Sequence, residues 1–219
     1  KSAEELDAME RAGVILGNLL AEVESRVAPG VSTGDLDDFA AEFIGSHEGA
    51  RAAFKGLYGF PKSACISVNQ EVVHGIPSPK RILSEGDIIS FDAGVVLDGW
   101  YADAAITVPV GDVSPDDRNL IDVTRAALEA GIAMAVPGNR MGDVGAAVQK
   151  VAEAAGFSIV RDLVGHGIGR EPHEDPQVPN FGKAGRGMPL EVGLVIAIEP
   201  MLMMTGLSSA TRRARATGG

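Results

Sequence analysis

Two aspartates, Asp92 and Asp103, stand eleven residues apart on opposite sides of a tight turn. They lie in the stretch 87–109, where two apolar runs rich in β-branched residues flank Asp98-Gly99. This dipeptide suits a two-residue type I′ turn, in which both central residues have positive φ. The stretch therefore predicts a β-hairpin that carries one acidic residue on each strand.

The turn also predicts the register of the hairpin. If Leu97 pairs with Trp100, then Gly94 lies opposite Asp103. Side chains alternate with a period of two along a strand, so Asp92, Gly94 and Asp103 share one face. The two aspartates are then diagonal neighbours, about 7–8 Å apart at the backbone, with a glycine that has no side chain between them.

Two acidic side chains on one face of an apolar hairpin are costly unless a cation lies between them. Carboxylates at this separation suit one or two divalent cations. The alternative is a pair of solvent-facing aspartates on an exposed sheet. The hairpin alone leaves both interpretations open.

Helices and short strands surround this hairpin. Apolar spacing, caps and Pro-Gly stops predict four helices, and apolar runs predict three more strands. The expected helices lie within 2–28, 32–44, 114–136 and 143–155, and the expected strands are 64–68, 158–160 and 193–199.

The chain contains an internal repeat. Residues 27–36 resemble 135–144 at an offset of 108, and residues 83–92 resemble 190–199 at an offset of 107. We therefore expect two halves facing each other across a pseudo-two-fold axis, with a site between them. The alternative is that two α+β halves share turn chemistry by chance. The repeat maps Asp92 onto Glu199.

Composition limits the class of protein. The 219 residues are 45% hydrophobic and carry a net charge of −11, which argues against non-specific binding to nucleic acid or anionic membranes. Cys65 is the single cysteine, so no internal disulfide is possible and a reducing compartment fits. Neither a signal peptide nor a membrane-spanning run is evident. We predict a cytoplasmic protein.

Asp92, Asp103, His166 and Glu199 form a mixed carboxylate and imidazole set. Such ligands suit Mn, Fe, Co or Zn. The chain resembles the type I methionine aminopeptidases, and the resemblance runs from its first residues to about Met204. Its motifs, in order, are Val73-His74-Gly75-Ile76-Pro77, Asp92 with Asp103, Gly165-His166-Gly167-Ile168-Gly169, His173 and Ile198-Glu199-Pro200-Met201.

This resemblance implies an α+β pita-bread fold, with two pseudo-symmetric halves of helices packed on an antiparallel sheet. The expected domain is 1–206, with halves of about 1–111 and 112–206. The implied activity is removal of the N-terminal methionine from nascent polypeptides, with two divalent ions per chain. The implied metal ligands are Asp92, Asp103, His166 and Glu199, of which Asp103 bridges both ions.

The resemblance also implies roles in catalysis and substrate binding. His74 would lie near the substrate amine and the leaving group, and His173 near the scissile carbonyl. Glu199 would act as the base toward the attacking water. Phe60 and Cys65 would line the pocket for the methionine side chain. Cys65 also fits a small core residue, His74 and His173 fit ordinary loop histidines, and His47 fits a surface helix.

The chain departs from the family after Gly206, where 207–219 match nothing in it and predict a disordered basic tail. The family continues through a strand pair with a last bridging glutamate. We therefore expect a truncated or frameshifted chain that lacks its last hairpin, binds one ion or binds weakly, and has reduced or absent activity.

Three functions follow as alternatives. The first is a methionine aminopeptidase, which acts on peptides and nascent chains with an N-terminal methionine, as a monomer and with the ribosome as a candidate partner. The second is a non-enzymatic pita-bread protein that binds peptides or ribosomes. The third is a proline-directed aminopeptidase, which the short N-terminal segment disfavours.

Overall fold

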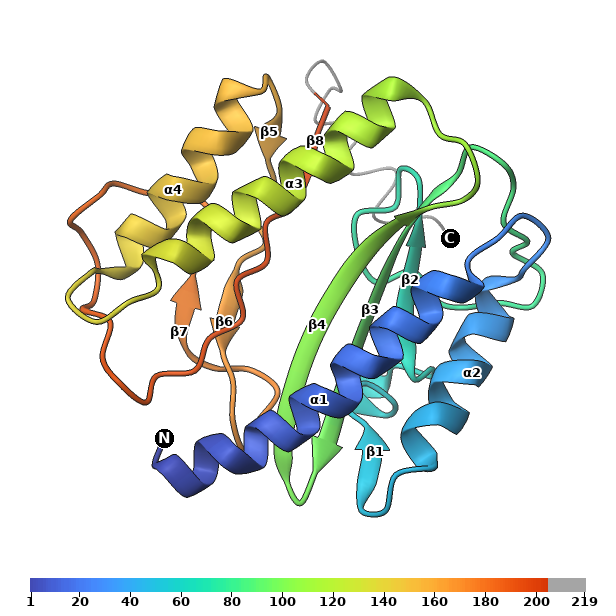
Figure 1. Ribbon diagram of the computed structural model, residues 1–219, viewed down its shortest axis with the longest axis horizontal. Helices are drawn as coiled ribbons and strands as arrows, with labels where there is room; N and C mark the ends of the chain where they lie inside the picture. Colours follow the sequence, from blue (N-terminus) through green and yellow to red (C-terminus); the bar gives the residue numbers. More distant parts are fainter. Residues whose placement is uncertain (205–219) are drawn as a thin grey trace. The chain divides into compact units, whose positions relative to one another are not determined.

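The predicted hairpin is part of a four-stranded antiparallel sheet in the computed structural model, which describes residues 1–204 (Figure 1). Its two long strands are β3 (Ile88–Leu97) and β4 (Trp100–Pro109). Two shorter strands, β1 (Ala50–Ala52) and β2 (Ala64–Val68), pair in succession along the other edge of β3. Hydrogen bonding along both edges holds the strand that carries Asp92. The predicted tail, 207–219, lies outside the described residues.

The register of the hairpin confirms the prediction. Leu97 pairs with Trp100, and Gly94 pairs with Asp103. The turn residues Asp98 and Gly99 have φ of 53° and 78°, as a type I′ turn requires. A turn of two residues leaves the pairing no freedom to slip, so local sequence was sufficient here.

The chain divides into two compact units, which we call the N-terminal unit and the C-terminal unit. The N-terminal unit comprises Glu4–Pro115 and Gly169–Pro172. The described residues of the C-terminal unit are Lys1–Ala3, Asp116–Ile168 and 173–204.

Two helices cover one face of the sheet in the N-terminal unit. They are α1 (Ala3–Arg26) and α2 (Thr33–Gly45), and α1 runs across β3 and β4 in Figure 1. The main core lies between these helices and the sheet, and its fully buried members include Leu19, Val23, Leu36, Ile44, Ile66, Ile89, Phe91 and Val95. Because side chains alternate along β3, this packing leaves Asp92 on the opposite face.

That opposite face carries a smaller apolar cluster. Its buried members are Ala53, Phe54, Cys65 and Val96, and Leu57, Phe60 and Tyr101 pack against them. Part of the cluster comes from the short 3-10 helix η1 (Leu57–Gly59). The apolar cluster and Asp92 therefore share one side of the sheet.

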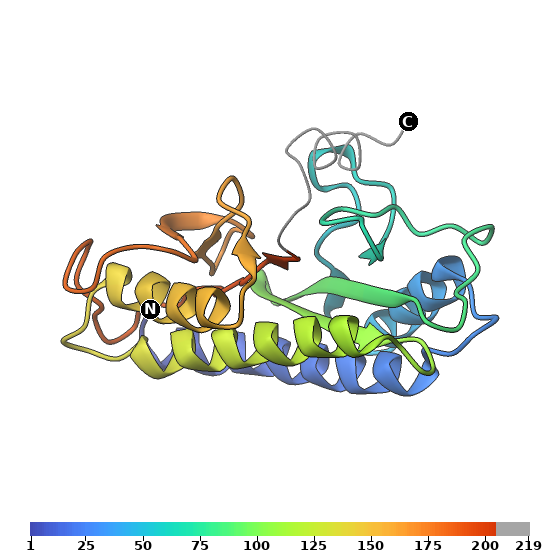
Figure 2. The same cartoon turned by 90° about the horizontal axis from the view of Figure 1, so that it is seen from above.

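The C-terminal unit combines two helices with short strand pairs. The helices are α3 (Pro115–Met134) and α4 (Met141–Ala154), which lie side by side in both views (Figures 1 and 2). The strands pair as β5 (Ser158–Ile159) with β8 (Leu202–Met203), and β6 (Gly165–Gly167) with β7 (Glu174–Val178). The core cluster is centred on Met141, Val144, Val178 and Leu190.

The internal repeat is visible in the hydrogen bonds of each unit. Ser32 forms a β-bridge with Ile82, and Arg140 forms one with Pro189. Each bridging residue stands directly before a helix whose third residue, Asp35 or Asp143, accepts a hydrogen bond from the N–H of that bridging residue at 3.0 or 2.7 Å. The recurrence favours repetition of one folding unit over chance turn chemistry.

Residues 193–199, predicted as a near-continuous strand, do not form one. Ile196 makes an isolated bridge with Gly167, and Ala197 N donates to His166 O at 2.7 Å. The pairing stops there because β6 has only three residues and its register with β7 shifts between His166 and Gly167. An apolar run predicts that a segment is buried. To form a β-strand, the segment also needs a neighbouring strand with regularly spaced backbone hydrogen bonds.

His47 also differs from the prediction. Helix α2 ends at Gly45, so His47 lies just beyond the helix. Its ring packs against Phe43, and Nδ1 lies 2.9 Å from Phe43 O.

Within residues 1–204, no helix is both long and apolar enough to cross a membrane.

Candidate metal centre

The two aspartates of the hairpin occupy one face of the N-terminal unit's sheet. Asp103 stands opposite Gly94 across the β3–β4 ladder, and Asp92 is two residues before Gly94 on β3. Both aspartates are half-buried. The predicted diagonal placement of two carboxylates is therefore present in the fold.

The space over Gly94 is filled by other residues. A Cβ at this position would lie 2.7 Å from Ala53 Cβ and 3.2 Å from Ala102 O. The segment containing Ala53 and Phe54 passes directly over the glycine, so the absent side chain permits close packing.

Cys65 lies directly opposite Asp92 on the neighbouring strand β2. The thiol is buried, and burial, together with the nearby charges of Asp92, Asp103 and Asp37, raises the pKa of Cys65 to about 12. Its neutral form makes it an apolar surface beside the acidic pair. Phe60 packs against the same apolar cluster, so both predicted pocket residues border one surface.

His74 lies in the N-terminal unit on the loop that follows β2, and its side chain is exposed. The next residue, Gly75, is anchored to β2: its N–H donates to Ser67 Oγ at 3.1 Å, and its carbonyl accepts from Ile66 N at 2.9 Å. The backbone beside His74 is thus held while the imidazole faces outward.

In the C-terminal unit, His166 and Glu199 converge. His166 is the middle residue of β6, and its Nε2 lies 3.1 Å from Glu199 Oε1. Its other ring nitrogen, Nδ1, lies 2.8 Å from Gly167 O. A carbonyl can only accept, so Nδ1 must carry the proton in this contact. Nε2 is then the nitrogen available to bind a ligand or a second proton.

The glycines on either side of His166 are required by close packing. A Cβ at Gly165 would collide with Ala197 O, and one at Gly167 would collide with Asp175 O. Backbone from two neighbouring segments therefore approaches β6 from both flanks. This packing holds the backbone on both sides of His166.

The pair has the chemistry of two ligands to one cation. Nε2 with its lone pair and a carboxylate oxygen repel each other unless a proton or a cation lies between them. Metal–ligand distances of about 2.0–2.2 Å place two ligand atoms on one ion roughly 3 Å apart. The Nδ1 contact with a backbone carbonyl is a common outer-shell support for a metal-bound histidine. His166 and Glu199 therefore fit a divalent cation.

His173 belongs to the same group of residues. It directly precedes β7, its ring is exposed, and it makes an edge-to-face contact with the His166 ring at a centroid distance of 4.4 Å. The structure thus brings His166, His173 and Glu199 together in the C-terminal unit. Asp92, Asp103, Cys65 and Phe60 gather in the N-terminal unit.

Sequence motifs missed one residue of this group, Asn180. Its side chain is only 1% exposed, and its Nδ2 donates to Glu199 O at 2.6 Å. A polar residue soon after a short strand is too common to be singled out. The close approach to Glu199 becomes apparent only in the fold.

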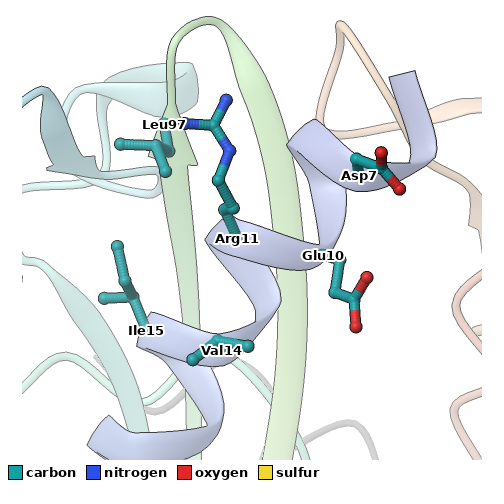
Figure 3. A pocket seen from close by; sticks show the side chains of 6 residues that line it. All are labelled: Asp7, Glu10, Arg11, Val14, Ile15 and Leu97. Carbon is teal, nitrogen blue, oxygen red and sulfur yellow. The ribbon is translucent and has the colours of Figure 1, made fainter. Parts of the chain in front are cut away.

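The N-terminal unit also contains a hollow of about 500 Å³ beside α1 (Figure 3). Its lining residues are Asp7, Glu10, Arg11, Val14, Ile15 and Leu97, of which all but Leu97 come from α1. None of these six is a predicted site residue.

Comparison with protein-family models gives a match to metallopeptidase family M24 over residues 7–214. The match includes residues 207–214, so the expectation that nothing after Gly206 matches the family was wrong for these residues. This chain belongs to metallopeptidase family M24. The expectation of a metal-dependent hydrolase is thereby confirmed, and family membership implies that the chain binds a divalent metal.

Relatives in the M24 family agree with this assignment. The chain is 51% identical over 204 residues to a methionine aminopeptidase of Clostridium perfringens, which covers 93% of this chain and 81% of that protein. It is 46% identical to methionine aminopeptidase 1 of Bacillus subtilis, in an alignment that covers 92% of this chain and 81% of that protein. The solved structure of methionine aminopeptidase from Rickettsia prowazekii superposes with a TM-score of 0.90 at 41% identity. The superposition covers 92% of this chain and 81% of that chain. The α+β pita-bread expectation is confirmed.

Proposed function

We propose that this M24 chain removes the N-terminal methionine from polypeptides by metal-dependent hydrolysis. The observation that carries the proposal is the convergence of His166 Nε2 and Glu199 Oε1 at 3.1 Å. The support from relatives is that proteins named methionine aminopeptidases are 46–51% identical over more than nine-tenths of the chain. The non-enzymatic alternative gains no such support.

We assign four metal ligands, Asp92, Asp103, His166 and Glu199. This assignment is supported by the ordered set of motifs and by membership of the M24 family. Asp103, His166 and Glu199 would be the ligands of one ion, and only Asp92 and Asp103 would remain for a second. We therefore expect unequal affinities for two ions, with Mn²⁺ and Co²⁺ as the first candidates.

When bound, a divalent ion polarises a carbonyl and acidifies a water molecule. The side chains do the remaining work. Glu199 accepts the proton of the attacking water. The imidazole of His173 donates a hydrogen bond to the scissile carbonyl oxygen and stabilises its developing charge. His74 is placed near the substrate amine and the leaving group.

The apolar cluster supplies the binding surface for the substrate side chain. Phe60 and Cys65 border one surface on the face that carries Asp92. The neutral thiol and the aromatic ring suit an unbranched thioether such as methionine. Nascent chains that begin with methionine are the proposed substrates. A monomeric state, ribosome association and a cytoplasmic location stay predictions.

The test is methionine release from a peptide that begins Met-Gly, using pure full-length protein with added Mn²⁺ or Co²⁺. We expect release that EDTA abolishes and that the Glu199→Gln variant lacks. A peptide with acetylated methionine is the matched substrate control, because it has no free amine. Folded, metal-loaded protein that releases no methionine would contradict the proposal.

A further inference from the structure

Asn180 lies two residues beyond β7, in the C-terminal unit that also holds His166, His173 and Glu199. Its side chain is 1% exposed, and its Nδ2 donates a 2.6 Å hydrogen bond to Glu199 O. A buried amide is thus joined to the backbone of a proposed metal ligand. The bond links two segments nineteen residues apart.

Glu199 needs such support because it lies outside every regular element. The neighbouring hydrogen bonds are Ala197 N to His166 O on one side and Val160 N to Met201 O on the other. Between these two anchors, the Asn180 amide holds the carbonyl of Glu199 itself. Loss of this bond would free the peptide unit from which the carboxylate extends.

Packing alone does not explain why a polar side chain stands at position 180, because the oxygen of the Asn180 amide has no partner in the described part of the chain. Its Oδ1 is buried and has no hydrogen-bond partner within residues 1–204. A buried acceptor without a partner is unfavourable, so an apolar side chain of the same size would suit pure packing better. What Asn180 adds over such a side chain is its bond to Glu199.

The orientation of the amide follows from the same contact. If the amide were turned around, Oδ1 would face the carbonyl oxygen of Glu199, and two acceptors would meet. The Nδ2 donor must therefore point to Glu199.

We propose that Asn180 is a positioning residue for the metal centre, which fixes the backbone of Glu199 so that its carboxylate meets His166 and the cation. The inference rests on the proposed role of Glu199 as a ligand. Residues that support a ligand typically change metal affinity about 10- to 100-fold when they are removed. Asn180→Leu, which keeps the size and removes the donor, should weaken Mn²⁺ binding at least about tenfold.

The experiment is calorimetric titration of Mn²⁺ into the metal-free full-length protein and its variants, with thermal unfolding of each metal-free variant. Asn180→Leu should bind Mn²⁺ more weakly, while its metal-free Tm changes little, because loss of the hydrogen bond to Glu199 O is offset by removal of the unpaired, buried Oδ1. Asn139→Leu is the matched control. In the wild type, Asn139 Nδ2 donates to Met134 O at 3.0 Å in the same unit, and Met134 is not a proposed ligand. The Mn²⁺ affinity of Asn139→Leu should therefore equal that of the wild type.

A second variant guards against misfolding. Asn180→Asp keeps the size and oxygen positions but replaces the donor with an acceptor, and it should also lose affinity. Wild-type Mn²⁺ affinity in either folded variant would overturn the inference, as would a fall in affinity that Asn139→Leu shares. If the wild type itself binds no Mn²⁺, or Glu199→Ala binds as tightly as the wild type, the ligand assignment fails instead.

Discussion

His166 presents its Nε2 to Glu199 Oε1 at 3.1 Å while its Nδ1 faces the Gly167 carbonyl at 2.8 Å. The carbonyl determines which nitrogen carries the proton, and therefore which nitrogen can bind a metal. His166→Asn should lower methionine release and Mn²⁺ affinity by about 100-fold or more, since a ligand is lost.

The same substitution at His47 is the matched control for His166→Asn. His47 lies beyond helix α2 in the N-terminal unit, where its ring packs on Phe43. Activity and metal content of His47→Asn should match the wild type, as measured by peptide hydrolysis and elemental analysis. Equal effects of the two variants would refute the role of His166.

Gly94 should tolerate no side chain. In Gly94→Ala the new Cβ would lie 2.7 Å from Ala53 Cβ and 3.2 Å from Ala102 O, so strand β4 or the Ala53 segment must move. We expect a loss of about 1–3 kcal/mol in the free energy of unfolding from overpacking. Methionine release should also fall, because the shift displaces Asp103.

Gly17→Ala is the control for Gly94→Ala, and urea titration measures the free energy of unfolding of both variants. We expect Gly17→Ala to raise this free energy. Gly17 is an exposed residue inside helix α1, and a Cβ there meets nothing within 4 Å. This change should stabilise the protein by about 0.5–1 kcal/mol. A Gly94→Ala variant as stable as the wild type would disprove the close packing over the hairpin.

Asp37 should hold the start of strand β2. Its buried Oδ1 accepts hydrogen bonds from Ser63 N at 2.8 Å and Ala64 N at 3.0 Å, and its Oδ2 pairs with Lys62 at 3.2 Å. Asp37→Ala leaves two buried donors unpaired and should cost about 2–4 kcal/mol of unfolding free energy.

Two further variants separate the hydrogen bonds of Asp37 from its charge. Asp37→Asn keeps the accepting oxygen and loses only the ion pair with the partly exposed Lys62, so it should cost about 1 kcal/mol or less. Asp38→Ala, at the exposed neighbouring position, should change stability little. If chemical denaturation shows equal losses for the Ala and Asn variants of Asp37, the charge and not the hydrogen bonds is responsible.

Asp143 should make stability depend on acid pH. Hydrogen bonds from Gly185 N and Arg140 N hold the pKa of the Asp143 carboxyl below its ordinary value. A lowered folded-state pKa stabilises the protein above the unfolded-state value, and that contribution is lost as the pH falls through the folded-state value. The stability difference between the wild type and Asp143→Asn should therefore be largest near neutrality and shrink on acidification.

Urea midpoints near pH 7 and pH 3 measure this difference. Asp35 is the repeat-related residue in the N-terminal unit, and its pKa is lowered by hydrogen bonds from Ser32. Asp35→Asn should show a pH trend of the same sign. A difference that grows on acidification in either variant would contradict the assignment of these carboxylates as charged acceptors.

Much of the proposed site could be predicted from local sequence. The Asp98-Gly99 turn and the period of two were enough to pair Gly94 with Asp103, and the structure confirms that register. The start of helix α2 was predicted equally well, because its Ser32 cap depends on residues within a few positions of one another. The order of the motifs was enough to predict an M24 metallopeptidase.

The tertiary structure decided what local sequence could not. It places Ala53 over Gly94, interrupts the expected strand at Ile196, and brings the Asn180 amide to Glu199. Each of these depends on backbone segments that are distant in the chain and approach closely only after packing. The sequence alone thus determined the proposed ligands and the hairpin that carries two of them. Packing decided what surrounds these residues and which side chain bonds to the Glu199 carbonyl, because such contacts have no local pattern.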